Sequence, residues 1–135
     1  MNNTITEDYV SFETAKLLKE KGFDEPCEMF YNEHFKSPYR GTLTKNSHTS
    51  SYTVPTQQMA MAWLREVHNI DIEVQTHYLN YLKPNDTRYY SGKILKGSED
   101  VIHTIYSKDT YEQACEAAIN YCLTHKELLD SLRIN

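Results

Sequence analysis

The stretch Thr53–Val74 constrains the fold most, because a helix start, an amphipathic helix and an alternating strand follow one another there. Pro55 lacks an amide proton and fixes its own φ, so it stands before or at the first turn of a helix. Thr56 can cap that helix by accepting a hydrogen bond from an amide two or three residues on. Gln57–His68 contains no Gly or Pro and is rich in good helix formers, which predicts a helix over this range.

One face of this helix is predicted to be buried. Apolar residues recur at the i, i+3, i+4, i+7 spacing that gathers them on one side of a helix. The single tryptophan of the chain is among them, and we expect it to anchor the helix. The residues of this face are Met59, Ala62, Trp63, Val67 and Ile70.

Asn69 is expected to end the helix, since Asn tolerates the left-handed conformation found at many helix ends. The hydrophobic period then changes from about 3.6 to 2, which predicts a strand with one buried face. The alternation breaks at Leu79–Leu82, where either a bulge shifts the register or both faces are covered. The residues expected on the buried face are Ile70, Ile72, Val74 and Thr76.

Two further strands are predicted after short turns. Short turns between neighbouring strands favour an antiparallel meander. The order is a turn at Lys83–Asp86, a strand at Arg88–Leu95, a turn at Lys96–Asp100 and a strand at Val101–Tyr106.

The last predicted helix begins with a capping box formed by Thr110 and Gln113. The segment His125–Asn135 either continues this helix or frays. The stripe expected to be buried consists of Tyr111, Ala114, Cys115, Ala118, Ile119, Tyr121 and Cys122.

The N-terminal part is less regular. Ser11 is a good cap for a helix over Phe12–Lys21, and Gly22 supplies a left-handed stop. Cys27–Tyr31 is a plausible short strand. Residues 35–51 lose their periodicity and are rich in turn formers, so we expect a long polar loop that is functional, mobile or both.

These elements predict an α+β fold in a single domain, residues 1–135. Residues 1–55 hold the N-terminal helix, the short strand and the polar loop. Residues 56–135 hold helix, three strands, helix. The predicted architecture is an antiparallel three-stranded meander with two flanking helices on one face, joined by an N-terminal helix and a short hairpin.

Composition limits the classes of function. The net charge is −5, and the concentrated basic surface that phosphate backbones require is missing from the sequence. Apolar runs are far shorter than a membrane span, and the N-terminus does not resemble a signal peptide. The three cysteines fit a reducing compartment, so we expect a cytoplasmic protein without a membrane segment.

Residues that carry chemistry do not form a recognisable motif. Cys27 and His34 are the one Cys/His pair near enough in sequence to suggest a nucleophile and a base. Cys115 and Cys122 are two helical turns apart, which favours small core-filling thiols. The six histidines lack metal-binding spacing, and glycine-rich phosphate loops are missing. We therefore expect neither a cofactor nor a metal.

Tyrosine is the conspicuous bias, with 11 of 135 residues. Tyrosine is favoured in strands and at protein interfaces because it offers a large area with a polar tip. The candidate interaction surface, or stacking surface for bases, consists of Tyr78, Tyr81, Tyr89 and Tyr90.

Two resemblances accompany these patterns. The helix–three strands–helix order resembles the double-stranded RNA-binding domain, which binds through a basic cluster at the start of its last helix. Here the start of that helix, Thr110–Glu116, is acidic. Most of the chain is similar to small uncharacterised proteins encoded in prophages and mobile elements of gut anaerobic bacteria. The segments that carry this similarity are Phe12–Phe23, Pro55–Ala60 with Trp63–Val67, and Thr110–Ala114.

Three functions remain open. The favoured hypothesis is a non-enzymatic accessory protein of phage or mobile-element origin that acts through protein–protein contacts, with an unknown partner or by self-association. The second is a nucleic-acid-binding regulator that uses the tyrosines, although the acidic charge makes nucleic acid a less expected partner. The third is a small enzyme that uses Cys27 or a histidine.

Overall fold

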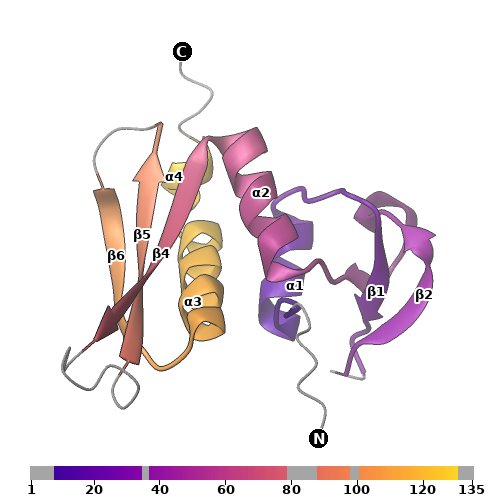
Figure 1. Ribbon diagram of the computed structural model, residues 1–135. Helices are drawn as coiled ribbons and strands as arrows, with labels where there is room; N and C mark the ends of the chain where they lie inside the picture. The colour runs from indigo at the N-terminus through magenta and orange to yellow at the C-terminus, as the bar shows by residue number, and fades with distance from the viewer. Residues whose placement is uncertain (1–7, 35–36, 79–87, 98–100, 131–135) are drawn as a thin grey trace, which may run out of the picture. The chain divides into compact units, whose positions relative to one another are not determined.

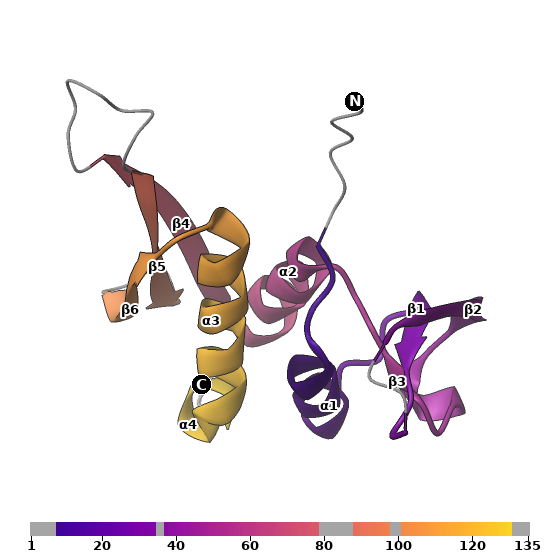
Figure 2. The same ribbon diagram turned by 90° about the horizontal axis from the view of Figure 1, so that it is seen from below.

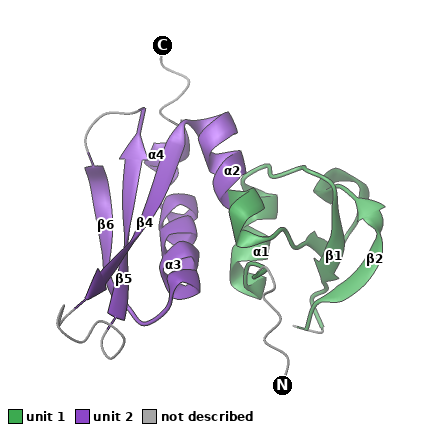
Figure 3. Ribbon diagram, viewed as in Figure 1, with its two compact units in different colours: residues 1–60 green, residues 61–135 purple. Residues whose placement is uncertain are grey.

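The computed structural model describes residues 8–34, 37–78, 88–97 and 101–130. The chain divides into two compact units, residues 1–60 and 61–135, which Figure 3 colours separately. Both units combine helices with an antiparallel three-stranded sheet, which confirms the α+β class. The division lies close to the predicted subdivision at residue 55. That both units fold as a single domain stays a prediction.

The first unit contains a small sheet with strand order β2-β1-β3. Ser11 caps the first helix by accepting a hydrogen bond from the amide of Thr14 at 3.2 Å, and Gly22 ends it with a φ of 96°, as predicted. Phe23, just past this stop, is buried. The elements are α1 (Phe12–Glu20), β1 (Cys27–Tyr31), β2 (Tyr39–Thr44), the short 3₁₀ helix η1 (Asn46–His48) and β3 (Tyr52–Thr53) (Figure 1).

The predicted polar loop at residues 35–51 is wrong for the part that the structure describes, because β2 and η1 occupy it. Asn46 holds this segment in place: its side-chain amide donates to the carbonyl of Phe23 at 2.9 Å, and its side-chain oxygen accepts from the amide of Thr53 at 3.0 Å. Lys19 adds hydrogen bonds to two backbone carbonyls, those of Thr49 and Ser51. Polar side chains therefore order the segment without a hydrophobic period.

Helix α2 (Gln57–His68) is shared by the two units. Thr56 caps it by accepting from the amide of Met59 at 3.1 Å, and Asn69 ends it with a φ of 59°, as predicted. Trp63 is buried as expected, with 7% of its surface exposed.

The rest of the predicted buried face of α2 is partly wrong. Met59 and Val67 are 39% and 50% exposed, and Ala62 is half-buried. The buried residues still follow the i, i+3, i+4, i+7 spacing, but that stripe starts at a polar residue, which hides it from a hydrophobicity pattern. Its members are Gln57, Ala60, Met61 and Leu64.

The second unit contains the predicted antiparallel meander, with strand order β4-β5-β6. Observed strand ends differ from the predicted ones by at most two residues where the structure describes both. The predicted turn at Lys83–Asp86 and the break at Leu79–Leu82 lie outside the described residues. The elements are β4 (Ile70–Tyr78), β5 (Arg88–Lys96), β6 (Val101–Lys108), α3 (Tyr111–Thr124) and α4 (Lys126–Asp130).

Helix α3 covers one face of this sheet and contacts all three strands (Figure 2). Gly92 of β5 lies under the helix, where an added Cβ atom would meet the carbonyl oxygen of Ala114 and the Cβ of Ala118 at the ordinary contact distance of 3.6 Å. Strand register then puts the even-numbered residues of β4 and β5 on the helix face, including the fully buried Ile70 and Ile94.

Two tyrosines predicted in the buried stripe of α3 are not buried. Tyr111 is 39% exposed and Tyr121 is half-buried. The predicted members that are buried are Ala114, Cys115, Ala118, Ile119 and Cys122, and Leu123 joins them. Helix α3 ends at Thr124, and the short α4 follows, so the chain after His125 is a separate helix as far as residue 130.

Candidate functional site

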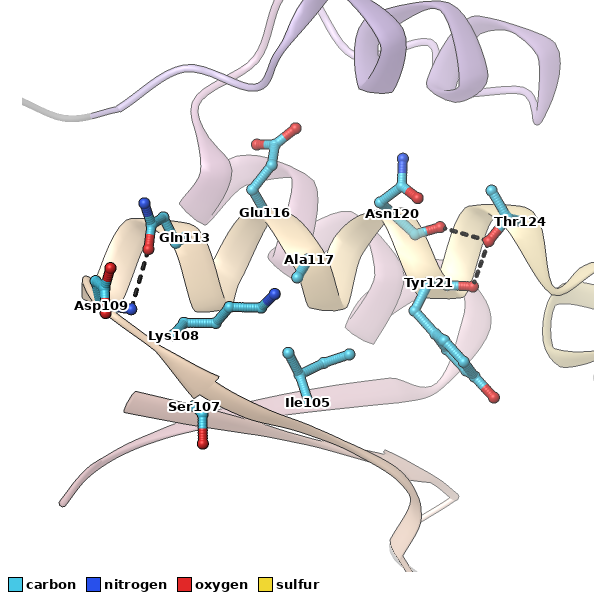
Figure 4. A pocket seen from close by; sticks show the side chains of 10 residues that line it. All are labelled: Ile105, Ser107, Lys108, Asp109, Gln113, Glu116, Ala117, Asn120, Tyr121 and Thr124. Atoms are coloured by element: carbon cyan, nitrogen blue, oxygen red, sulfur yellow. Dashed lines mark hydrogen bonds between the residues drawn. The ribbon is translucent and has the colours of Figure 1, made fainter. Parts of the chain in front are cut away.

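An open groove with a volume of about 720 Å³ lies between β6 and α3 in the second unit (Figure 4). We call it the β6–α3 groove. It is lined by Ile105, Ser107, Lys108, Asp109, Gln113, Glu116, Ala117, Asn120, Tyr121 and Thr124.

The capped start of α3 fixes one end of the groove. Thr110 accepts a hydrogen bond from the amide of Gln113 at 3.0 Å, and the side-chain oxygen of Gln113 accepts from the amide of Asp109 at 3.0 Å (Figure 4). These reciprocal bonds confirm the predicted capping box. They set the angle between the end of β6 and the start of α3.

An irregularity in β6 sets which of its side chains enter the groove. The β5–β6 register shifts between Tyr90 and Gly92, and Ser107 opposite has a φ of 54°, which is typical of a bulge. Figure 4 shows Ile105 pointing toward α3 and Ser107 pointing away from it. Ile105 and Ala117 therefore form an apolar floor in the middle of the groove.

Tyr121 forms a wall whose ring is held between two imidazoles. The ring of His103 stacks on it with centroids 3.9 Å apart and planes 6° apart, and the ring of His125 stacks at 3.6 Å and 18°. Two parallel rings this close to one ring must lie on its opposite faces. His125 Nδ1 also lies 2.8 Å from the carbonyl oxygen of Tyr121. The tyrosine ring is thus preorganised.

The remaining lining residues are polar but nearly balanced in charge. Lys108 extends along the groove toward Ala117, whereas the carboxylate of Glu116 points away from β6 (Figure 4). Asp109 adds a second carboxylate at the capped end. In the part of the chain that the structure describes, Lys108 has no ion pair. A groove with one cation and two carboxylates does not select a highly charged ligand.

The four tyrosines predicted as one surface do not share a face where the structure describes them. Tyr90 pairs with Thr76, on the helix face of the sheet, and its ring contacts Tyr111 of α3 at 6.4 Å. Tyr89 pairs with His77 on the opposite face and stacks on it at 4.8 Å. The remaining two are Tyr78, which is 47% exposed at the end of β4, and Tyr81, which lies outside the described residues.

The opposite face of the sheet carries a serine–histidine pair. Ser91 Oγ lies 2.8 Å from His77 Nε2, a distance suited to a nucleophile and its base. Ser91 is 5% exposed, and among the described residues no acidic side chain bonds to His77. Among the described residues it lacks the third, orienting group of a catalytic triad, so we interpret it as a cross-strand hydrogen bond.

Cys27 and His34 are not brought together. Cys27 begins β1 and His34 lies beyond the other end of that strand. The thiol of Cys27 donates a hydrogen bond to the carbonyl of Glu25 at 3.6 Å, and burial raises its pKa. Burial also raises the pKa of Cys122 to about 12. Both thiols are therefore poor nucleophiles at neutral pH.

Two further features, a metal-binding group of side chains and a helix that could span a membrane, are missing from the described residues. Within them, groups of three or more His, Cys, Asp or Glu side chains able to hold a metal ion do not occur. The helices that the structure describes are all too short or too polar to cross a membrane.

The groove was not predicted from the sequence because its lining residues come from separate elements, β6 and α3, and from the turn between them. Gln113 was predicted as part of the capping box, but Asn120 and Thr124 were not singled out. Their spacing of three to four residues, together with Ala117, was the available signal: it marks a second, polar stripe beside the buried one.

No protein-family model, curated protein or solved structure matches this chain.

Proposed function

We propose that this chain is a non-enzymatic protein-binding module, and that the β6–α3 groove is the surface that holds its partner. The observation that carries the proposal is the open groove of about 720 Å³ beside an edge strand, with an apolar floor and hydrogen-bonding walls. Such a mixture suits a polypeptide, which offers both apolar side chains and backbone polar groups. An accessory role in a phage or mobile element remains part of the proposal and rests on the resemblance described above.

Exposed apolar side chains of β6 that lie outside the groove lining add support for protein contact at this strand. Strand β6 carries Val101 and Ile102, which are 44% and 42% exposed, and Tyr106, which is 74% exposed. Large apolar and aromatic side chains gathered on one exposed strand are typical of contact surfaces.

The two alternatives have weaker support. A nucleic-acid regulator needs stacking rings on one surface and a basic field, but Tyr89 and Tyr90 lie on opposite faces and the net charge is −5. An enzyme needs an activated nucleophile, but the pKa of Cys27 is raised rather than lowered.

The test uses the chain as bait for affinity purification from its native host, with mass spectrometry as the readout. Three baits are compared: the wild type, Ala117→Arg and Thr104→Arg. Ala117→Arg fills the groove floor without changing the buried stripe of α3. Thr104 of β6 pairs with Lys93 on the sheet face away from α3, so Thr104→Arg is a control that introduces the same side chain outside the groove.

The proposal predicts at least one protein recovered with the wild type and with Thr104→Arg, and reduced about tenfold or more with Ala117→Arg. Circular dichroism and melting curves must show that all three baits are folded. The proposal is contradicted if every captured protein is recovered equally with all three baits. It is also contradicted if none of the baits captures a protein.

A further inference from the structure

We propose that the occupant of the β6–α3 groove is an extended segment of a partner protein, about five residues long, that pairs with β6 as an added strand. This inference rests on the proposed function and specifies its ligand. It follows from the open edge of β6, from the length of the groove and from the position of α3.

The open edge supplies the backbone contacts. In the described residues, β6 pairs with β5 alone, so the other edge of Val101–Lys108 presents unpaired N–H and C=O groups. Such an edge is a template for another extended chain. Since the groove borders this same strand, a chain that pairs with β6 has room for the side chains it turns toward α3.

The length of the groove sets the length of the segment. Its lining residues on α3 run from Gln113 to Thr124, about 16 Å at the helical rise of 1.5 Å per residue. An extended chain covers that distance with about five residues at 3.3 Å each. Four residues of helix and two of strand both advance by about 6–7 Å, so successive inward side chains of the segment meet successive turns of α3.

The lining then predicts the side chains. The middle position lies over Ile105 and Ala117, which favours an aliphatic residue. The positions two residues to either side lie near Gln113 at one end and Asn120 at the other, which favours hydroxyl or amide side chains. The expected pattern is polar, any, aliphatic, any, polar, with little net charge.

The position of α3 argues against a second copy of this chain as the occupant. Helix α3 lies over β5, with Ala114 and Ala118 above Gly92. If two β6 strands paired edge to edge, the two α3 helices would be separated by three strand spacings, about 14 Å. Packed helices lie about 8–10 Å apart, so the paired copies would leave a gap between them. A segment without a helix of its own avoids this gap.

The experiment uses a phage-displayed library of random twelve-residue peptides, selected on the wild-type chain and counter-selected on Ala117→Arg. The expected result is an enriched pattern with an aliphatic residue between two polar ones. The best synthetic peptide should bind the wild type and Thr104→Arg equally, and Ala117→Arg at least tenfold more weakly. It should also slow amide hydrogen exchange within β6 at least tenfold.

Backbone pairing has its own signature. Methylating single backbone nitrogens of the peptide should weaken binding at least tenfold at alternate positions and have little effect at the positions between, because alternate amides face β6. A helical bound peptide, or weakening without alternation, would overturn the inference and leave the proposed function standing. So would a wild-type dimer in sedimentation that Ala117→Arg abolishes. A selection that enriches no groove-dependent peptide also overturns it.

Discussion

Replacing Lys96 with methionine should destabilise the second unit, because the ammonium of this lysine satisfies two helix ends. Lys96 Nζ donates to the carbonyl oxygen of His68 at 2.6 Å and to that of Leu128 at 2.8 Å. His68 is the last residue of α2, and Leu128 lies in the short helix α4, which has five residues. The last carbonyls of a helix lie beyond its regular hydrogen-bond pattern, so a donor that reaches them stabilises the helix end.

The magnitude follows from these two bonds. A hydrogen bond to a charged group contributes about 1.5–3 kcal/mol, and a site that is only partly buried lies at the lower end because water can replace the donor. Favourable contact with the negative ends of two helix dipoles is lost as well. Lys96→Met keeps the aliphatic stem, so we expect a loss of about 2–3 kcal/mol, or roughly 8–12 °C in Tm.

The assay is urea unfolding followed by circular dichroism, together with thermal melting. The matched control is Lys93→Met on the opposite face of β5, which removes a lysine ammonium without an observed hydrogen bond and should change stability by less than about 0.5 kcal/mol. If Lys96→Met and Lys93→Met unfold at the same urea concentration, the two carbonyl contacts do not stabilise the protein and this reasoning is refuted.

Three further predictions test the core, the N-terminal segment and the helix–sheet contact. Trp63→Ala should cost on the order of 3–5 kcal/mol in urea unfolding, and the native tryptophan fluorescence should be blue-shifted; a red-shifted emission and an unchanged Tm would place the indole on the surface. Ser47 donates through its amide at 2.7 Å and its hydroxyl at 2.9 Å to Asp24, which lowers the pKa of that carboxyl below 3.8. The stability from this depressed pKa is present above pH 3.8 and lost as the pH falls through the lowered pKa, so Asp24→Asn should melt below the wild type at pH 6, by a difference that shrinks as the pH falls below 3.8; a difference in Tm that stays constant with pH would exclude the effect. Gly92→Ala should stabilise by about 0.4–1 kcal/mol, since the new methyl meets its neighbours at ordinary contact distances of 3.6–3.8 Å, and a lower Tm would show that α3 lies closer than described.

Element ends were predictable because they depend on local chemistry. Ser11, Thr56 and Thr110 cap helices through their own side chains, and Gly22 and Asn69 reach the left-handed region at low cost. Each of these effects is confined to four or five neighbouring residues. The α+β class followed, because the hydrophobic period changes where the elements change.

Buried faces were less predictable because packing partners decide them. In α2 two stripes have the helical spacing, and the one that begins with the polar Gln57 is buried while Val67 of the other is exposed. The order of residues 39–48 likewise depends on Asn46, whose partners Phe23 and Thr53 are distant in sequence.

The candidate site could be predicted only in fragments. The capping box at Thr110 was visible, but the groove lining also depends on the β5–β6 register, which pairs Ile105 with Gly92 on the helix face and shifts beside Ser107. The stacking of Tyr121 between two histidines joins residues of β6 and α3 that the sequence separates. Hydrophobic patterning predicted that tyrosine as core, whereas its position makes it a wall of the groove.

The most direct test of the central claim is amide hydrogen exchange of the wild-type chain with and without the protein that it captures. Binding in the β6–α3 groove predicts at least tenfold slower exchange within Val101–Lys108, and unchanged exchange in β4, the opposite edge of the same sheet. Protection confined to β4, or to residues 8–60, with β6 exchanging as in the free protein, would contradict the claim that this groove holds the partner.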